Sequence, residues 1–265
     1  YVNFSNAGFN LPTEFSDEQQ KLLKKHYRKM FKLYDKFVAA EIPVEDARFI
    51  LPYGLKTNIY MSLNARELIH VICTMIYGRG KHYSEIYTLG MQLKQQFDAR
   101  YPGLVEASQK DYSSDLSSAL QVKVAPCKKI EYVKHSSTLI SKPTITAETL
   151  DDFAKFCGYE KYDFSLALKD DKLAKMLEHF TYTFKVENFS LIILKHYTRH
   201  RMQSLSTPPI VAIAQNHKFV MPDSIASKPE LKADFESAIK ENRRLFNKLV
   251  AMDINPYLYI YATPH

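Results

Sequence analysis

The most informative stretch of the sequence reads EHFTYTFKVENFSLIILKHYTRHRMQS and runs from Glu178 to Ser204. Polar and apolar residues alternate over Phe180–Glu187, which predicts a strand. The apolar segment Phe189–Leu194 follows and predicts a helix that carries the basic triplet Arg199-His200-Arg201. Two guanidinium groups and an imidazole at the end of an apolar helix suit an anionic ligand, a phosphate before any other.

The composition is typical of a folded protein with anionic partners. The 265 residues are 46% hydrophobic and 25% charged, which excludes a disordered chain and suffices for one large domain or two modest ones. The net charge of +7 and the pI near 9.0 favour nucleic acid, a phosphorylated metabolite or a nucleotide cofactor as partner. No apolar run reaches the roughly 20 residues of a membrane-spanning helix, so no membrane partner is expected.

The cysteines and histidines predict neither a disulfide framework nor a metal site. Cys73, Cys127 and Cys157 lie far apart and form no C-x-x-C pair. His196 and His200 have the spacing of a helical zinc site, but the residue after His196 is not the glutamate that such sites carry. We therefore expect a protein of the reducing cytoplasm without a bound metal ion.

The two ends of the chain resemble each other. Leu33–Ile42 (LYDKFVAAEI) matches Leu245–Ile254 (LFNKLVAMDI) at an offset of 212 positions. Upstream, Phe9–Pro12 matches Phe219–Pro222 at an offset of 210. The chain is thus expected to start inside one copy of a unit and to stop inside a second copy.

This repeat divides the chain into three parts. Residues 1–105 are expected to be the later part of copy one, and residues 146–265 the earlier part of copy two. Residues 106–145 contain prolines, paired lysines and a Ser/Thr-rich patch, so they are expected to be a linker.

Helical signals dominate the remaining sequence. Ser16 and Gln19 form a capping-box pattern before a long segment of helical periodicity, and Asn64 with Glu67 resembles a second cap. Ile59–Leu63 could form a short strand. The expected helices are 16–42, 43–48, 64–77, 83–100, 146–156, 172–177 and 229–252.

The fold class follows from these elements. Helices with few strands predict an α+β or mixed α/β fold, rich in helix, with a small central sheet and two partial repeat copies in one chain. Within the strand Phe180–Glu187, Tyr182, Phe184 and Val186 share one face and are expected to lie in the core.

Two blocks of residues carry a resemblance to a known family. Glu178-His179, Thr183–Glu187, Ser190 and the triplet with Ser204 follow in order the pattern E-H…F-T-F-x-[IV]-E-x-x-S…R-H-R-x-x-S, which resembles the flavin-dependent thymidylate synthases. Copy one supplies the second block of that family, at similar spacing. It consists of Ala47-Arg48, Leu51-Pro52, Thr57, Asn64-Ala65-Arg66-Glu67-Leu68 and His70.

The resemblance implies an activity and a set of ligands. It implies methylation of dUMP to dTMP, with methylenetetrahydrofolate as one-carbon donor, FAD as hydride carrier and NADPH as reductant. It also implies a tetramer-like assembly of copies in which sites form across interfaces, and no catalytic side chain, because the flavin performs the chemistry.

The same resemblance assigns the site residues. Arg199, His200, Arg201 and Glu178 would border the flavin, with Asn64, Arg66 and His70 reaching it from a neighbouring copy. Arg48 would face the phosphate of dUMP. The substrate site would further include Ser204, His196 and Arg79, of which the last could replace an arginine that the family carries nearby.

The sequence also departs from the family. After the triplet, Pro209, Val211 and Ala212 stand where the family has serine, arginine and tyrosine. The offset of 212 puts Ile260 at the copy-two position of Arg48, so that arginine is also lost. The basic triplet of copy one is expected upstream of Tyr1.

Several alternatives remain open. A degenerate family member with a structural or regulatory role would explain these losses. A nucleic-acid-binding module would explain the charge, but the sequence has no aromatic-basic motif for it. The triplet could simply complement a helix dipole, and Asn64 could simply cap its helix.

Overall fold

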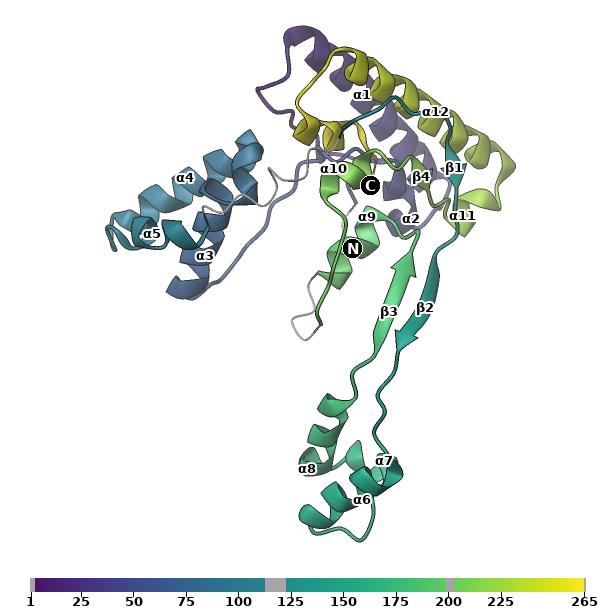
Figure 1. The fold of residues 1–265 in the computed structure, drawn as a ribbon. Helices are drawn as coiled ribbons and strands as arrows, with labels where there is room; N and C mark the ends of the chain where they lie inside the picture. The colour runs from purple at the N-terminus through teal and green to yellow at the C-terminus, as the bar shows by residue number, and fades with distance from the viewer. Residues whose placement is uncertain (1–2, 113–122, 199–202, 265) are drawn as a thin grey trace. The chain divides into compact units, whose positions relative to one another are not determined.

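The two long helices α1 (Asp17–Ala39) and α12 (Pro229–Ala251) lie side by side (Figure 1). The computed structural model describes residues 3–112, 123–198 and 203–264. These residues fall into a larger unit, formed by residues 1–132 and 190–265, and a smaller unit of residues 133–189. Both long helices belong to the larger unit.

Local signals set the ends of the long helices. The Ser16 side chain accepts a hydrogen bond from the Gln19 backbone N–H (3.3 Å), and the Ser16 N–H donates to Gln19 Oε1 (2.9 Å). This capping box starts α1 where the sequence predicts it. Helix α12 starts at Pro229, which is tolerated in the first turn because no N–H is needed there.

Short helices follow each long helix. Helices α2 (Val44–Ala47) and η1 (Arg48–Ile50) come after α1, and η5 (Pro256–Ala262) comes after α12. Together the long and short helices bury two large apolar clusters. The first centres on Leu23, Tyr27, Phe246, Leu249 and residues 258–262; the second centres on Tyr34, Phe37, Ile50, Phe235 and Ile239.

A helical group is formed by α3 (Ala65–Ile76), η2 (Arg79–His82), α4 (Ser84–Asp98), α5 (Leu104–Ala107) and η3 (Gln109–Asp111). Helices α3 and α4 pack closely at Gly90. A Cβ atom there would lie 2.7 Å from both Ile76 Cγ2 and Met75 Cβ. Glycine therefore lets the two helices approach around a third cluster that contains Ile72, Cys73 and Phe97.

The remaining elements of the larger unit are short. Strand β1 (Glu131–Tyr132) pairs in parallel with β4 (Lys218–Phe219), and helices α9 (Leu191–Tyr197), α10 (Ile210–Ala214) and α11 (Asp223–Ala226) complete the unit. Asn247 of α12 exchanges two hydrogen bonds with the Cys127 backbone, at 2.7 and 3.1 Å. The segment before β1 is thereby attached to α12.

The smaller unit combines a hairpin with short helices. Strand β2 (Ser136–Ser141) pairs antiparallel with β3 (Thr183–Glu187), with Thr138 opposite Lys185 and an irregularity between Leu139 and Ser141. Its helices are α6 (Ala147–Phe156), α7 (Phe164–Ala167), α8 (Asp171–Ala174) and η4 (Lys175–His179). Among the described side chains, five are buried in these helices: Leu150, Ala154, Ala167, Leu173 and Met176. Three of them, Ala154, Ala167 and Leu173, form one core cluster.

The structure confirms a helix-rich fold and corrects three expectations. The described residues form two separate two-stranded sheets, so the single central sheet is wrong. Ile59–Leu63 forms no strand; Ile59 is 81% exposed and Tyr60 is fully exposed, because no neighbouring strand pairs with them. Tyr182 and Phe184 are 52% and 56% exposed, so they are not core residues.

Candidate functional site

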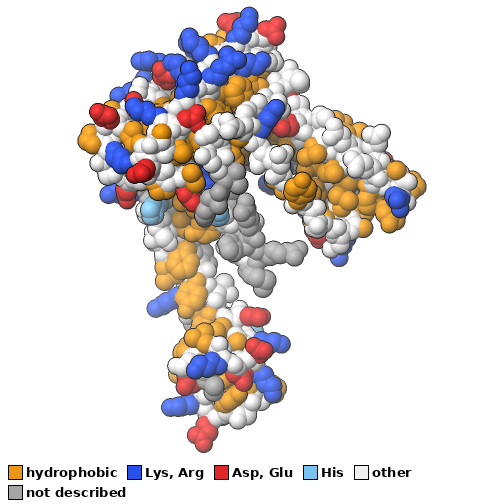
Figure 2. Space-filling model, turned by 180° about the vertical axis from the view of Figure 1, so that it is seen from behind, with side chains coloured by type: hydrophobic (Ala, Val, Ile, Leu, Met, Phe, Trp, Pro, Cys, Tyr) orange, Lys and Arg blue, Asp and Glu red, His pale blue; other side chains and the backbone are white. Residues whose placement is uncertain are grey.

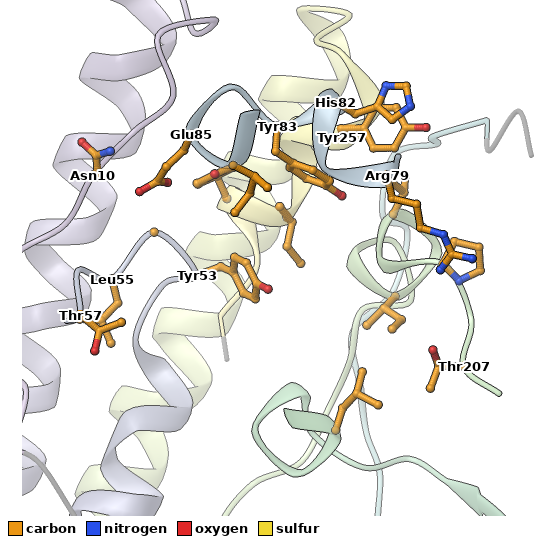
Figure 3. A pocket seen from close by; sticks show the side chains of 18 of the residues that line it. Asn10, Tyr53, Leu55, Thr57, Arg79, His82, Tyr83, Glu85, Thr207 and Tyr257 are labelled. Atoms are coloured by element: carbon orange, nitrogen blue, oxygen red, sulfur yellow. The ribbon is translucent and has the colours of Figure 1, made fainter. Parts of the chain in front are cut away.

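A cavity of about 750 Å³ opens in the larger unit between segments that are far apart in the sequence (Figure 3). Its lining comes from residues 53–57, from η2 and the start of α4, from residues 207–213, and from η5. Its volume is typical of sites for small organic ligands. The cavity therefore joins residues of both expected copies.

Tyrosines form much of the cavity wall. Tyr53, Tyr83, Tyr257 and Tyr261 line it, and the His82 ring stacks on Tyr257 with a centroid distance of 4.3 Å and an interplanar angle of 8°. Tyr83 meets the same ring edge-on, with centroids 5.6 Å apart. These contacts hold the aromatic rings in defined orientations, so the wall suits a planar aromatic ligand.

Burial raises the pKa values of three of these phenols. The pKa of Tyr83 rises to about 12, and the pKa values of Tyr53 and Tyr261 rise as well. Protonated phenols can donate and accept hydrogen bonds at physiological pH. They would contact a ligand ring without adding negative charge to the site.

Close packing holds residues 53–57 in place. A Cβ atom on Gly54 would lie 2.7 Å from the Asn10 backbone oxygen and 2.8 Å from Tyr27 Cε2. The Tyr27 hydroxyl donates a 2.6 Å hydrogen bond to the Tyr261 backbone oxygen. Tyr27 thus ties the Gly54 segment to η5 directly behind the cavity.

Charged side chains also line the cavity. Lys56, Arg79, His82 and Glu85 contribute to it, and Figure 3 shows Arg79 on the same side as Thr207. Arg79 was predicted to be a substrate-site residue, and it lies in this cavity beside the loop that follows the basic triplet. Its guanidinium group can meet an anionic group of a ligand.

Three residues that the sequence pattern predicts to depart from the family meet in this cavity. Pro209, Val211 and Ile260, which are expected to replace a serine and two arginines, all line the wall. Proline has no N–H, and the side chains of valine and isoleucine have no hydrogen-bond donor. These three positions therefore cannot hold a phosphate by side-chain hydrogen bonds.

A second cavity, of about 570 Å³, lies in the helical group formed by α3, η2, α4, α5 and η3. Arg66 and His70 line it together with Asp111 and Tyr112, and His70 Nδ1 lies 2.6 Å from the Tyr112 hydroxyl. The structure thus brings two of the predicted flavin contacts together. Asn64 caps α3 through a 2.9 Å hydrogen bond from the Glu67 N–H, as its alternative role predicts.

The other predicted site residues that the structure describes line neither cavity. Arg48 lies in η1, Glu178 lies in η4 of the smaller unit, and His196 and Ser204 are exposed in the larger unit. Arg199, His200 and Arg201 lie outside the described residues. Within the described chain, no group of three or more His, Cys, Asp or Glu side chains is arranged to hold a metal ion.

Sequence reasoning missed the aromatic wall. Tyr53 directly follows the Leu51-Pro52 motif, which could have suggested it as a site residue. Tyr257 and Tyr261 lie in the run PYLYIY, whose tyrosines could have been noted as a repeated aromatic pattern. Nothing local in the sequence brings either group to Tyr83, because these contacts form only in the folded chain.

Comparison with known proteins places the chain in a family. The family model described as "Thymidylate synthase complementing protein" matches residues 1–103 and 124–262. The flavin-dependent thymidylate synthase of Sulfurisphaera tokodaii is 28% identical over 93 residues, which are 35% of each chain. That of Haloarcula marismortui is 42% identical over 55 residues, which are 21% of this chain and 22% of the relative.

A third relative matches nearly the whole chain. The UPF0159 protein Ta1429 of Thermoplasma acidophilum is 22% identical over 278 aligned positions, covering 95% of this chain and 52% of that protein. The chain thus spans about a third of the Sulfurisphaera enzyme and about half of the Thermoplasma protein. No solved structure matches. None of the described helices is long and apolar enough to cross a membrane.

The family model covers both blocks of motif residues and most of the chain between and around them. The cavity is built from segments within both matched ranges. The chain therefore belongs to the thymidylate synthase complementing protein family, the family of the flavin-dependent thymidylate synthases.

Proposed function

We propose that this chain acts in flavin-dependent thymidylate synthesis, the methylation of dUMP to dTMP. The observation that carries this proposal is the cavity in which Arg79 and His82 lie beside a wall of tyrosines. Aromatic faces suit a flavin or pyrimidine ring, and the guanidinium group suits an anionic ligand. Family membership and the basic net charge of +7 support the same ligands.

The residues of this chain would bind and orient, and FAD would supply the redox chemistry. A bound FAD would supply the hydride-transfer chemistry that links NADPH to reduction of the one-carbon unit taken from methylenetetrahydrofolate. The tyrosine wall and the stacked His82 would hold a ring and exclude water from its faces. Arg66 and His70 in the second cavity, and the triplet Arg199-His200-Arg201, remain proposed flavin contacts.

The nucleotide phosphate is proposed to bind at Arg48 and not at Ile260. These two residues occupy equivalent positions in the two expected copies, and of the two side chains only that of arginine can bind a phosphate. Ser204 and His196 remain proposed contacts on the substrate side.

A second candidate is a non-catalytic family member. It is supported by Pro209, Val211 and Ile260, which together remove three donors from a single cavity wall. In that case the chain would keep the fold and the interfaces of the family and would complete or regulate sites formed elsewhere. Binding of nucleic acid has no comparable support, because neither cavity combines a basic track with stacked aromatic platforms along a strand.

Assembly with further copies is also proposed. Large apolar side chains are exposed on residues 59–63 and on α4, among them Tyr60, Met61, Tyr87, Leu89 and Met91. Figure 2 shows hydrophobic side chains, in orange, on the surface of the α3–α4 group. Apolar surface of this kind supports a homo-oligomer with a tetramer-like arrangement, which a light-scattering mass would test.

The first experiment measures colour and turnover. The purified chain is expected to bind FAD, with flavin absorbance in the blue, and to oxidise NADPH faster when dUMP is added. The Arg79→Ala variant should lose most of the dUMP stimulation. Arg100→Ala, a change at an exposed arginine outside the cavity, should not.

The outcomes separate the two candidates. Bound flavin without dUMP-stimulated NADPH oxidation would favour the non-catalytic member. A chain that binds neither FAD nor dUMP would refute the proposed synthase activity. If lost donors explain weak dUMP binding, Val211→Arg should raise dUMP affinity by about tenfold, while Val211→Met should not.

A further inference from the structure

The two long helices have matching bounds. Helices α1 and α12 each have 23 residues, and both ends are separated by 212 positions, from Asp17 to Pro229 and from Ala39 to Ala251. Each helix is followed by a non-glycine residue in the left-handed region, Glu41 (φ 60°) and Asp253 (φ 50°). The helical segments that come next, 44–50 and 256–262, keep the same offset.

The buried faces of the two helices also match. Each buried residue of α1 corresponds to a buried residue of α12 at the offset of 212 positions. The pairs are Leu23 with Phe235, His26 with Ala238, Tyr27 with Ile239, Met30 with Asn242, Tyr34 with Phe246 and Phe37 with Leu249.

The two large apolar clusters are images of each other. Leu23 and Tyr27 lie in the first cluster, and their counterparts Phe235 and Ile239 lie in the second. Conversely, Tyr34, Phe37, Ile42, Ala47 and Ile50 lie in the second cluster, and their counterparts Phe246, Leu249, Ile254, Tyr259 and Ala262 lie in the first. Exchanging the copies thus exchanges the clusters, as a two-fold rotation would.

Two contacts mark where the rotation axis passes. Lys29 Nζ lies 2.9 Å from Glu241 Oε1, and these residues answer each other at the offset of 212. Pro52 forms an antiparallel bridge with Pro264, its own counterpart at the same offset. In an isologous pair, only residues at the axis meet their own equivalents.

We propose that the two half-copies pair inside this one chain as the subunits of an isologous dimer do, around a pseudo-two-fold axis through Lys29–Glu241 and Pro52–Pro264. The partner of copy one's long helix is the long helix of copy two. The apolar clusters hold the pair together, and the charge pair makes it selective. Pairing of like copies would set two ammonium groups or two carboxylates face to face on the axis.

This pairing makes the two sides of the molecule chemically different. The rotation that exchanges the copies carries Ile260, in the cavity wall, onto Arg48. In a dimer of identical subunits, every substitution would appear in both symmetry-related sites. Fusion of unlike copies lets one side keep an arginine while the other becomes apolar, whether or not the chain turns over dUMP.

The symmetry is tested by distances between nitroxide labels in the full chain. Cysteines would replace exposed residues in pairs, Lys21 with Lys240 and Arg28 with Ala233, in a Cys157→Ser background with the other two cysteines buried. The rotation exchanges these two pairs, so double electron–electron resonance should give the same most frequent label-to-label distance for both pairs. Different modal distances would overturn the pseudo-two-fold axis.

The same four sites provide the control. The four sites can also be combined as Lys21 with Ala233 and as Arg28 with Lys240. The rotation maps each of these pairs onto itself, so the symmetry does not require the two distances to be equal. The ion pairs Lys29–Glu241 and Lys36–Asp234 show that α1 and α12 run antiparallel. Lys21 and Ala233 therefore lie far from the axis contact along the helices, and Arg28 and Lys240 lie next to it. The first distance should be clearly longer; equal values would show that the labels do not report the helix geometry.

The selectivity of the axis pair is tested by reversing charges. Lys29→Glu and Glu241→Lys should each lower the thermal midpoint by about 1 to 3 °C, and the double variant should restore it. As a matched control, Lys32→Glu, one turn away on the exposed face, should not be rescued by Glu241→Lys. A Lys29→Glu/Glu241→Lys chain no more stable than the single variants would contradict the charge-based selectivity.

Discussion

At the level of single residues, the hydrogen-bond geometry around His26 requires its imidazole ring to be neutral. The Asn242 Nδ2 atom donates a 2.5 Å hydrogen bond to the Ala262 backbone oxygen, and the same nitrogen lies 3.3 Å from His26 Nε2. Because an amide nitrogen is only a donor, His26 Nε2 must accept, which requires a neutral ring. Burial acts in the same direction and lowers the pKa of His26 to about 4.

This low pKa predicts a pH-dependent stability. The unfolded chain binds a proton at His26 below its ordinary pKa of 6.5, while the folded chain does so only near pH 4. The contribution of His26 is therefore fully present above pH 6.5 and is lost as the pH falls from 6.5 towards 4. The loss in unfolding free energy amounts to at most about 3 kcal/mol.

Urea unfolding at pH 7 and pH 4.5 would measure the effect. The His26→Gln variant should lose less stability between these two pH values than the wild type does. His135→Gln, at an exposed histidine, serves as the control and should keep the wild-type slope. An unchanged slope in His26→Gln would mean that another group dominates the acid response.

At the element scale, helix ends were predictable because their signals are local. The capping box of Ser16 and the caps of Asn64 and Thr146 each depend on three or four neighbouring residues. Strands were less predictable. The alternation of Phe180–Glu187 indicates an extended chain, but only the fold decides whether a second layer covers its face, and none does here.

The site shows the same limit. The sequence pattern led to Arg79, which lies in the cavity, because a family motif precedes it closely. The ring contact between Tyr83 and Tyr257 spans 174 positions, and Tyr53 and Tyr261, which line the same cavity, are 208 positions apart. No local pattern encodes such contacts.

The start of α1 can be weakened without touching its core. Ser16→Ala removes the acceptor for the Gln19 N–H, so we expect the free energy of unfolding to fall by about 1 kcal/mol. Ser16→Asp keeps an acceptor and should stay within a few tenths of a kcal/mol of the wild type. Chemical denaturation with a circular-dichroism readout measures both, and equal losses would show that the cap contributes nothing.

The contact between α3 and α4 can be tested at Gly90. Alanine improves helix propensity by about 1 kcal/mol, but its Cβ would lie 2.7 Å from Ile76 Cγ2 and from Met75 Cβ, atoms near the helix backbone that cannot move far. Overpacking of this kind costs about 1 to 3 kcal/mol, so Gly90→Ala should destabilise the α3–α4 group. Thr88→Ala, at an exposed site of α4, should be neutral or stabilising, and a stabilised Gly90→Ala would disprove the close packing.

At the scale of the whole molecule, the two units differ in how much apolar surface they bury. The larger unit contains two extensive clusters around α1 and α12 and a third around α3 and α4. The smaller unit has one small cluster of Ala154, Ala167 and Leu173, with Leu150 and Met176 also buried, and the residues of β2 are exposed throughout. Since burial is the main stabilising contribution, local stability should follow this division.

Hydrogen exchange would measure this difference along the chain. Amides of β2, β3 and α6 should exchange at least about tenfold faster than the central amides of α1 and α12, because opening the hairpin exposes little additional apolar surface. Amides within α4 should be intermediate, since α4 packs on one modest cluster. Equal protection in both units would mean that residues 133–189 unfold only together with the long helices, which their small core does not predict.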